Sequence, residues 1–123
     1  MTKIKTHKFF PVPIFEFKIQ SYEELNKKLE EYIYKLKEID PKGIKLSNNG
    51  GWHSPYFKIG ESEVLKDFVK IIQKYLSEII TVDFGWAFRN DKVIIEGMWS
   101  VVNKKNSFNI RHSHPNCMLS AAY

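Results

Sequence analysis

Two histidines separated by one residue, His112 and His114, are the side chains of this sequence best suited to chemistry. On an extended chain, residues i and i+2 project to the same face, so both imidazoles can contact one metal ion while the backbone stays regular. Imidazole binds iron, zinc, copper and nickel, and the spacing therefore predicts a metal site without selecting the metal. The same pattern also fits two half-exposed loop histidines that bind nothing.

The residues around this pair are polar or small. Asn103, Asn109 and Asn116 lie on either side of it, and no aspartate or glutamate follows Glu96. Any further ligand from this part of the chain must therefore be histidine, cysteine, asparagine or a backbone oxygen. A few polar groups next to an aromatic, apolar strand are typical of a small-molecule pocket. Asn103 equally fits a turn asparagine at a strand end, and Asn109 fits a residue that fixes the loop backbone.

The elements that would position the pair are two helices followed by strands. Ser21 begins a capping box with Glu24, and helical spacing of apolar residues continues to the turn at 40–43. A second helix, with an apolar stripe broad enough to cover a sheet, is predicted over 62–80. Residues 47–57 read as an irregular loop. Strands or short extended segments are predicted over 14–19, 83–88, 93–102, 108–114 and 118–123. Helices followed by a run of strands indicate an α+β fold with a mostly antiparallel sheet.

Composition limits the classes of protein to which the chain can belong. Its 123 residues suffice for a single domain, 1–123, and 43% hydrophobic with 27% charged residues is typical of a globular chain. No apolar run is long enough to span a membrane. The formal charge is +5, but Arg89 and Arg111 are the only arginines, which argues against a nucleic-acid partner. Arg111 is expected to face solvent.

The single cysteine, Cys117, excludes an internal disulfide and fits a reducing, cytoplasmic location. We expect it to be a small buried hydrophobic residue, and we expect Trp52 and Trp99 to belong to the core. The basic N-terminus leads into no apolar segment with a cleavage site, so no signal peptide is expected.

Four segments of the chain resemble the core motifs of a family of 2-oxoglutarate- and Fe(II)-dependent oxygenases. Residues 98–103 and 108–116 resemble its tryptophan–asparagine and N-x-x-H-x-H-P-N segments, and residues 119–123 resemble its L-S-G-x-Y-Y segment. Residues 50–54 match its Gly-Gly-Trp-His-Ser motif. The resemblance spans residues 47–123.

This resemblance implies a double-stranded β-helix, or jelly-roll, that holds Fe(II) at one open end and uses 2-oxoglutarate as cosubstrate. The expected fold is then N-terminal helices packed on an incomplete jelly-roll, and the expected activity is that of a dioxygenase. His112 matches the first ligand of the superfamily's H-x-D/E…H triad, and His114 stands where the carboxylate usually stands, as is usual for this family. Asn103, Ser120 and Tyr123 are candidates for cosubstrate contacts, although core packing explains the last two equally well.

Two family features match no position of this chain: the distal histidine ligand and the basic residue that pairs with 2-oxoglutarate. We therefore expect residues 1–123 to form the N-terminal part of an oxygenase-like domain. His53 is a weaker candidate for the third ligand, because its loop precedes the barrel strands. Full activity is expected to need residues beyond 123, from the same reading frame or a second chain.

Two other classes remain open. A cupin-like metalloprotein also uses His-x-His, but it expects a glutamate a few residues later, and residues 115–122 contain none. The other is non-enzymatic: an inactive fragment, or a small binding module that forms a homodimer through an exposed apolar edge strand at 118–123.

Overall fold

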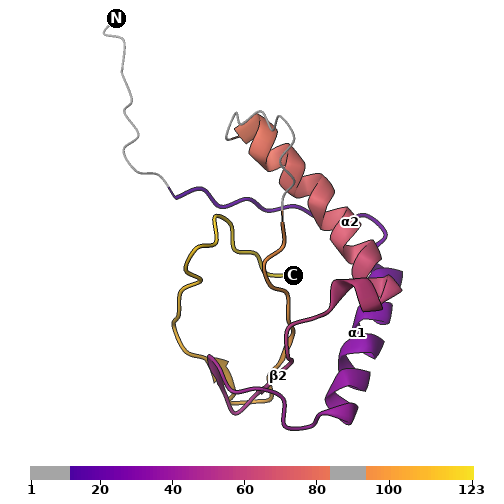
Figure 1. The fold of residues 1–123 in the computed structure, drawn as a ribbon, viewed down its shortest axis with the longest axis vertical. Coiled ribbons are helices and arrows are strands. Elements are labelled where there is room, and N and C mark those ends of the chain that lie inside the picture. Colours follow the sequence, from indigo (N-terminus) through magenta and orange to yellow (C-terminus); the bar gives the residue numbers. More distant parts are fainter. Residues whose placement is uncertain (1–11, 84–93) are drawn as a thin grey trace, which may run out of the picture.

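The computed structural model describes residues 12–83 and 94–123, and its elements follow the predicted order of helices and then strands (Figure 1). The helical elements are α1 (Tyr22–Ile39), the 3₁₀ turn η1 (Ile59–Glu61), α2 (Glu63–Glu78) and the π-helical turn η2 (Ile79–Asp83). The strands are β1 (Asn48–Asn49), β2 (Trp52–His53), β3 (Val101–Val102) and β4 (Phe108–Asn109). The strand predicted over 83–88 lies outside the described residues, except for its first residue. Residue 93, the first of the strand predicted over 93–102, also lies outside them.

The two helices are confirmed, but the predicted capping box is wrong. Ser21 has φ 53° and ψ 44°, a left-handed conformation, and its side chain makes no capping hydrogen bond. An N-cap hydroxyl needs an extended backbone to reach the free N–H groups of the first turn. The turn that enters α1 therefore removes the geometry that the sequence pattern predicts.

The strand predicted over 14–19 is not formed, because this segment packs against α2 instead of pairing in a sheet. The Phe17 ring stacks on Tyr75 with centroids 4.0 Å apart, and Ile19 is buried. The Tyr75 hydroxyl donates a hydrogen bond to the Lys18 carbonyl. Of the apolar face predicted for this segment, Ile19 is buried and Phe15 half-buried, whereas Phe17 stays 38% exposed although it stacks on the helix (Figure 1).

The core lies between the two helices and the first strands. Leu29 of α1 and Leu65 and Val69 of α2 are buried, as are Ile79 and Ile80 in the turn that ends α2. These residues lie on the apolar stripes that the helical spacing predicts. Burying such side chains supplies the main stabilisation of a small helical pair, about 1.5–3 kcal/mol each.

The segment predicted to be an irregular loop, 47–57, contains two strands. β1 pairs antiparallel with β4, and β2 pairs antiparallel with β3, with Trp52 opposite Val102. Two further backbone bonds, from Ser54 to Ser100 and from Phe57 to Met98, continue the second pairing. Residues 48–57 and 98–109 therefore run side by side. The first segment changes direction at Gly50–Gly51, and the second changes direction at the 103–107 turn.

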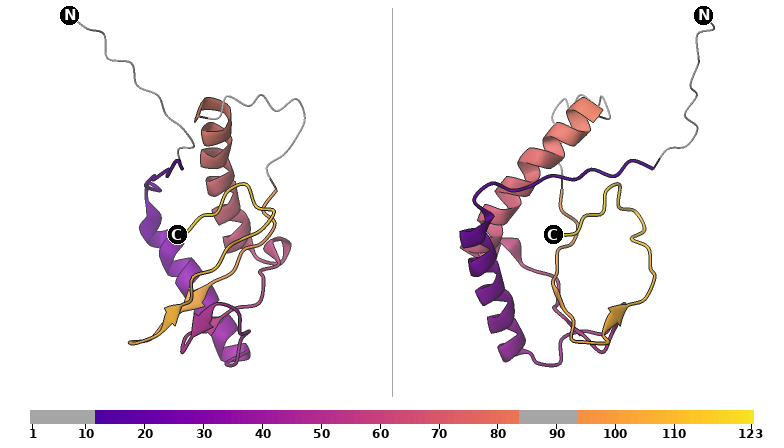
Figure 2. Two further views of the ribbon diagram at one scale, coloured as in Figure 1. Left: turned by 90° about the vertical axis from the view of Figure 1, so that its left-hand side faces the viewer. Right: turned by 180° about the vertical axis from the view of Figure 1, so that it is seen from behind.

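Figures 1 and 2 show the helices on one side of the molecule and residues 94–123 curving into an open loop on the other. Among the described residues, the paired strands are short and antiparallel, and residues 118–123 form no strand, unlike the prediction. The α+β arrangement is compatible with this, and the jelly-roll stays a prediction. No helix in the described ranges is long and apolar enough to cross a membrane.

Candidate metal centre

The segment that carries the histidine pair is anchored at its beginning by β4. The Ile110 N–H donates to the Ser47 carbonyl at 2.8 Å, and the Asn109 side-chain amide donates to the Ser47 hydroxyl at 3.1 Å. Asn109 also accepts a hydrogen bond from the Asn103 side chain at 3.0 Å. Asn109 thus fixes the loop through the side chains of Ser47 and Asn103, which lie next to β1 and β3, and not through the loop backbone as expected.

The structure brings the rings of His112 and His114 together. Their centroids lie 4.8 Å apart with the planes at 83°, and His112 is exposed while His114 is half-buried. Two imidazoles at this distance can turn their ring nitrogens toward a common point by side-chain rotation alone. The backbone between them holds this geometry without a strand of its own.

One ring nitrogen of His112 is already engaged by the backbone. Its Nδ1 lies 2.8 Å from the Ile110 carbonyl oxygen. A carbonyl can only accept, so Nδ1 carries the proton in this arrangement and Nε2 is the nitrogen left with a lone pair. A metal-binding histidine usually donates its second N–H in this way, which fixes the tautomer and orients the ring.

Trp99 connects the histidine pair to the sheet. Its indole lies 5.4 Å from the His114 ring, tilted by 42°, and 5.7 Å from the His53 ring, nearly parallel at 14°. Tyr56 contacts the same indole at 5.4 Å. These distances are typical of favourable ring contacts. The indole is half-buried, so Trp99 is partly a core residue, as expected, and also one wall of the candidate site.

His53 does not complete a ligand set. It is 1% exposed, its Nδ1 is 2.6 Å from the Ser54 carbonyl oxygen, and its ring packs on Trp99. Across the ranges 12–83 and 94–123, no group of three His, Cys, Asp or Glu side chains is close enough to hold a metal ion. The described residues thus offer a two-imidazole site that needs water, cosubstrate or other ligands to fill the remaining positions.

The three candidate cosubstrate residues do not lie with the histidines around one cavity. Asn103 and Tyr123 line an open cleft of about 500 Å³ between α1 and β3, and neither histidine lines it. The Tyr123 hydroxyl donates to Asn26 of α1 at 2.6 Å, and its ring packs on Phe68 of α2 at 4.9 Å. Burial raises the pKa of the Tyr123 hydroxyl above its ordinary value. Ser120 is exposed.

Three further residues can be compared with their predictions. Cys117 is exposed, so the expectation of a buried thiol is wrong. It follows a turn at Asn116, whose φ of 64° reverses the chain, and this turn keeps the side chain outside the core. Trp52 is buried, as expected, and its indole N–H donates to the Asp40 carbonyl. Arg111 is exposed, as expected.

Ser47 ties the candidate centre to the rest of the molecule, and no sequence pattern points to it. It is 9% exposed, and both its carbonyl and its hydroxyl accept hydrogen bonds from the β4 side. A serine in a turn-rich segment is ordinary, and only the pairing of β1 with β4 reveals its role.

Comparison with known proteins adds no relative: no family model, curated protein or solved structure matches the chain. The geometry of the histidine pair and the motifs around it are therefore the features that point to a function.

Proposed function

We propose that the chain binds a divalent metal ion through His112 and His114 and that it is the metal-binding part of a 2-oxoglutarate- and Fe(II)-dependent dioxygenase. The observation that carries the metal proposal is the paired imidazoles, 4.8 Å apart, with the His112 Nδ1 against a backbone carbonyl. The choice of iron and of 2-oxoglutarate comes from the motif resemblance of residues 47–123.

The roles of the chain's own residues follow from these contacts. His112 would bind the ion through Nε2, because Nδ1 is held by Ile110. His114 would be the second ligand, and Trp99 would limit its rotation and exclude water from one side. When bound, Fe(II) with 2-oxoglutarate would supply oxygen chemistry for hydroxylating a C–H bond. Two neutral imidazoles leave the ion its full charge, which favours anionic ligands such as a cosubstrate carboxylate.

Substituting either histidine tests the metal proposal. We expect wild type to bind Ni²⁺ or Fe²⁺ and to lose affinity on His112→Ala or His114→Ala by about 10–100-fold or more, the loss that even supporting residues of metal sites produce. Calorimetry measures the affinity. Quenching of Trp99 fluorescence by Ni²⁺ provides a second readout, because the indole lies 5.4 Å from His114.

Arg111→Gln is the matched control, since it lies in the same exposed segment and supplies no imidazole. Its metal affinity should equal that of wild type. Equal affinity of wild type and both histidine variants would remove the metal proposal. A second outcome is that the chain binds metal but forms no succinate from 2-oxoglutarate, even with substrate candidates present. This result would contradict the dioxygenase proposal for this chain and would support only a metal-binding module.

A further inference from the structure

A small polar cavity of about 170 Å³ lies at the end of the molecule where α1 stops and the strands turn. Three lysines from separate segments line it: Lys37 in the last turn of α1, Lys42 after that helix, and Lys104 after β3. Gly50 and Gly51, between β1 and β2, form another side. The tertiary structure thus brings three cations and a glycine pair to one cavity, away from the histidines.

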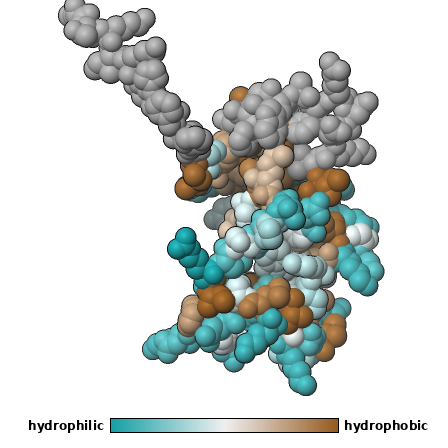
Figure 3. Space-filling model, turned by 60° about the vertical axis from the view of Figure 1, so that its left-hand side comes forward, coloured by the Kyte–Doolittle hydropathy of each residue, from teal (hydrophilic) through white to brown (hydrophobic). Residues whose placement is uncertain are grey.

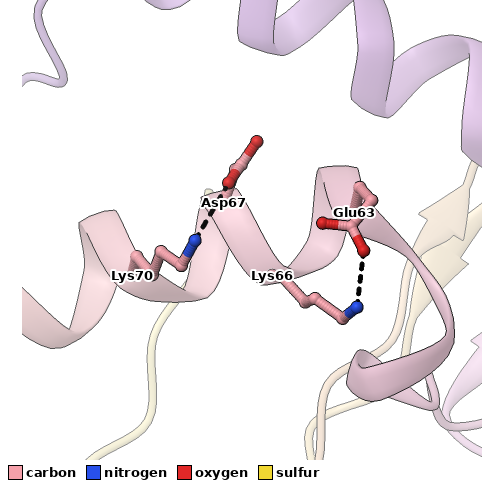
Figure 4. Close-up of polar contacts among 4 residues, drawn as sticks. All are labelled: Glu63, Lys66, Asp67 and Lys70. Atoms are coloured by element: carbon pink, nitrogen blue, oxygen red, sulfur yellow. Dashed lines mark hydrogen bonds and ion pairs between the residues drawn. The ribbon is translucent and has the colours of Figure 1, made fainter.

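Among the described residues, none of these lysines forms an ion pair with an acid, and the Lys37 ammonium lies 5.6 Å from the centre of the Tyr34 ring. The four ion pairs among the described residues all use other lysines, and Figure 4 shows two of them on α2, Lys66 with Glu63 and Lys70 with Asp67. No carboxylate belongs to the described lining of the cavity. Glu38 and Asp40 lie close to these lysines in sequence, but neither lines the cavity, and Asp40 accepts a hydrogen bond from the Gly43 N–H. Unpaired charges of one sign in a concave site attract a counter-ion.

The glycine pair adds hydrogen-bond donors to this charge. Within the described part of the chain, the backbone N–H groups of Gly50 and Gly51 donate to no protein acceptor. Gly50 has φ +75°, and backbone N–H groups in such turns form anion-binding concavities. The buried Trp52, held by its bond to the Asp40 carbonyl, gives the cavity a fixed wall. Donors and charges are therefore present on a rigid support.

We propose that this cavity binds a phosphate group. Lysine binds phosphate as a point charge, whereas planar carboxylates are matched best by the guanidinium fork, and the described lining contains no arginine. At about 170 Å³ the cavity is smaller than typical sites for whole small molecules, which start near 300 Å³, and suits one tetrahedral oxyanion. The group can belong to free phosphate or to a phosphate monoester whose remaining part extends into solvent. This site is independent of the proposed metal centre.

Titration with inorganic phosphate at constant ionic strength tests the site in the metal-free chain. We expect the amide NMR signals of Gly50 and Gly51 to shift to saturation. In Lys37→Gln/Lys104→Gln the dissociation constant should rise by roughly tenfold or more, because two charge-assisted contacts are lost. A parallel titration with glycerol phosphate identifies the source: tighter binding indicates a monoester ligand, and equal or weaker binding indicates the free anion.

The double variant Lys27→Gln/Lys74→Gln is the control, since it removes the same charge from exposed helix positions outside the cavity. It should bind phosphate within about twofold of wild type. An equal loss in both double variants would mean diffuse attraction to a cationic protein and would overturn the proposal. Glycine signals that do not respond to either phosphate compound would overturn it as well.

Discussion

At the scale of single residues, the histidine pair and the glycine pair depend on different kinds of contact. His112 is positioned by one polar contact with its own backbone, two residues earlier. Gly51 leaves room for a polar contact: a Cβ atom at this position would collide with the Asn103 side-chain oxygen and force that side chain to move. Asn103 in turn bonds Asn109 at the start of the histidine segment. The glycine at position 51 therefore leaves room for the Asn103 side chain, which helps to position the segment that carries the histidine pair.

Replacing Gly51 by alanine should destabilise the protein by about 0.5–1.5 kcal/mol, because a methyl group there displaces the exposed Asn103 side chain and breaks its hydrogen bond with Asn109. Urea denaturation followed by circular dichroism measures the change. Gly60→Ala is the matched control, since a Cβ there meets nothing within 4 Å, and its stability should equal that of wild type or slightly exceed it. Equal stability of the two variants would contradict the close contact.

At the scale of elements, side-chain contacts decide how the terminal segments dock. Residues 12–20 lie along α2 through Phe17 and Ile19, and the end of the described chain lies against both helices through Tyr123. Neither segment joins a sheet. The helices therefore supply the surface on which the less regular parts of the molecule are fixed.

The Tyr123 contact should make stability depend on alkaline pH. The residue is 65% exposed, and its partial burial against the helices raises the pKa of the hydroxyl, so the folded protein holds the proton slightly more tightly than the unfolded chain does. The contribution of this hydroxyl to folding stability is complete below pH ~10, the ordinary pKa of tyrosine. It is lost as the pH rises through the pKa of the folded protein. The melting temperature of wild type should therefore fall more steeply above pH ~10 than that of Tyr123→Phe. Parallel pH profiles of the two proteins would exclude this linkage.

At the scale of the whole molecule, burial is unevenly distributed. The helices and the paired strands hold the buried residues, whereas residues 108–123 are largely exposed. Fourteen large hydrophobic side chains are exposed in the described structure, and Figure 3 shows apolar patches among polar surface on one face. The candidate metal segment belongs to the more exposed part of the described chain, where a bound ion would add a cross-link.

Hydrogen exchange should reveal this division. Of the backbone N–H groups in residues 111–123, only that of Cys117 donates a hydrogen bond within the described structure, so these amides should exchange quickly. Amides inside α1 and α2 should be protected. Adding Ni²⁺ should slow exchange in peptides covering residues 110–118 of wild type but not of His112→Ala. Protection that is uniform along the chain, or unchanged by metal in wild type, would contradict this division.

The sequence by itself determined the two helices, their apolar faces and the pairing of His112 with His114, because these depend on local spacing. Helical periodicity is a property of neighbouring residues, and two side chains two positions apart remain neighbours in most conformations. For residues 14–19 the sequence predicted the buried position of Ile19 but neither the exposure of Phe17 nor the helix as packing partner.

Only the tertiary structure decided which distant segments meet. The pairing of β1 with β4 and of β2 with β3, the packing of His53 on Trp99 and the gathering of Lys37, Lys42 and Lys104 all join residues far apart in the chain. Strands of two residues carry too little pattern to be recognised locally. Their register is fixed by contacts such as the Gly51–Asn103 approach, which exist only once both segments are in place.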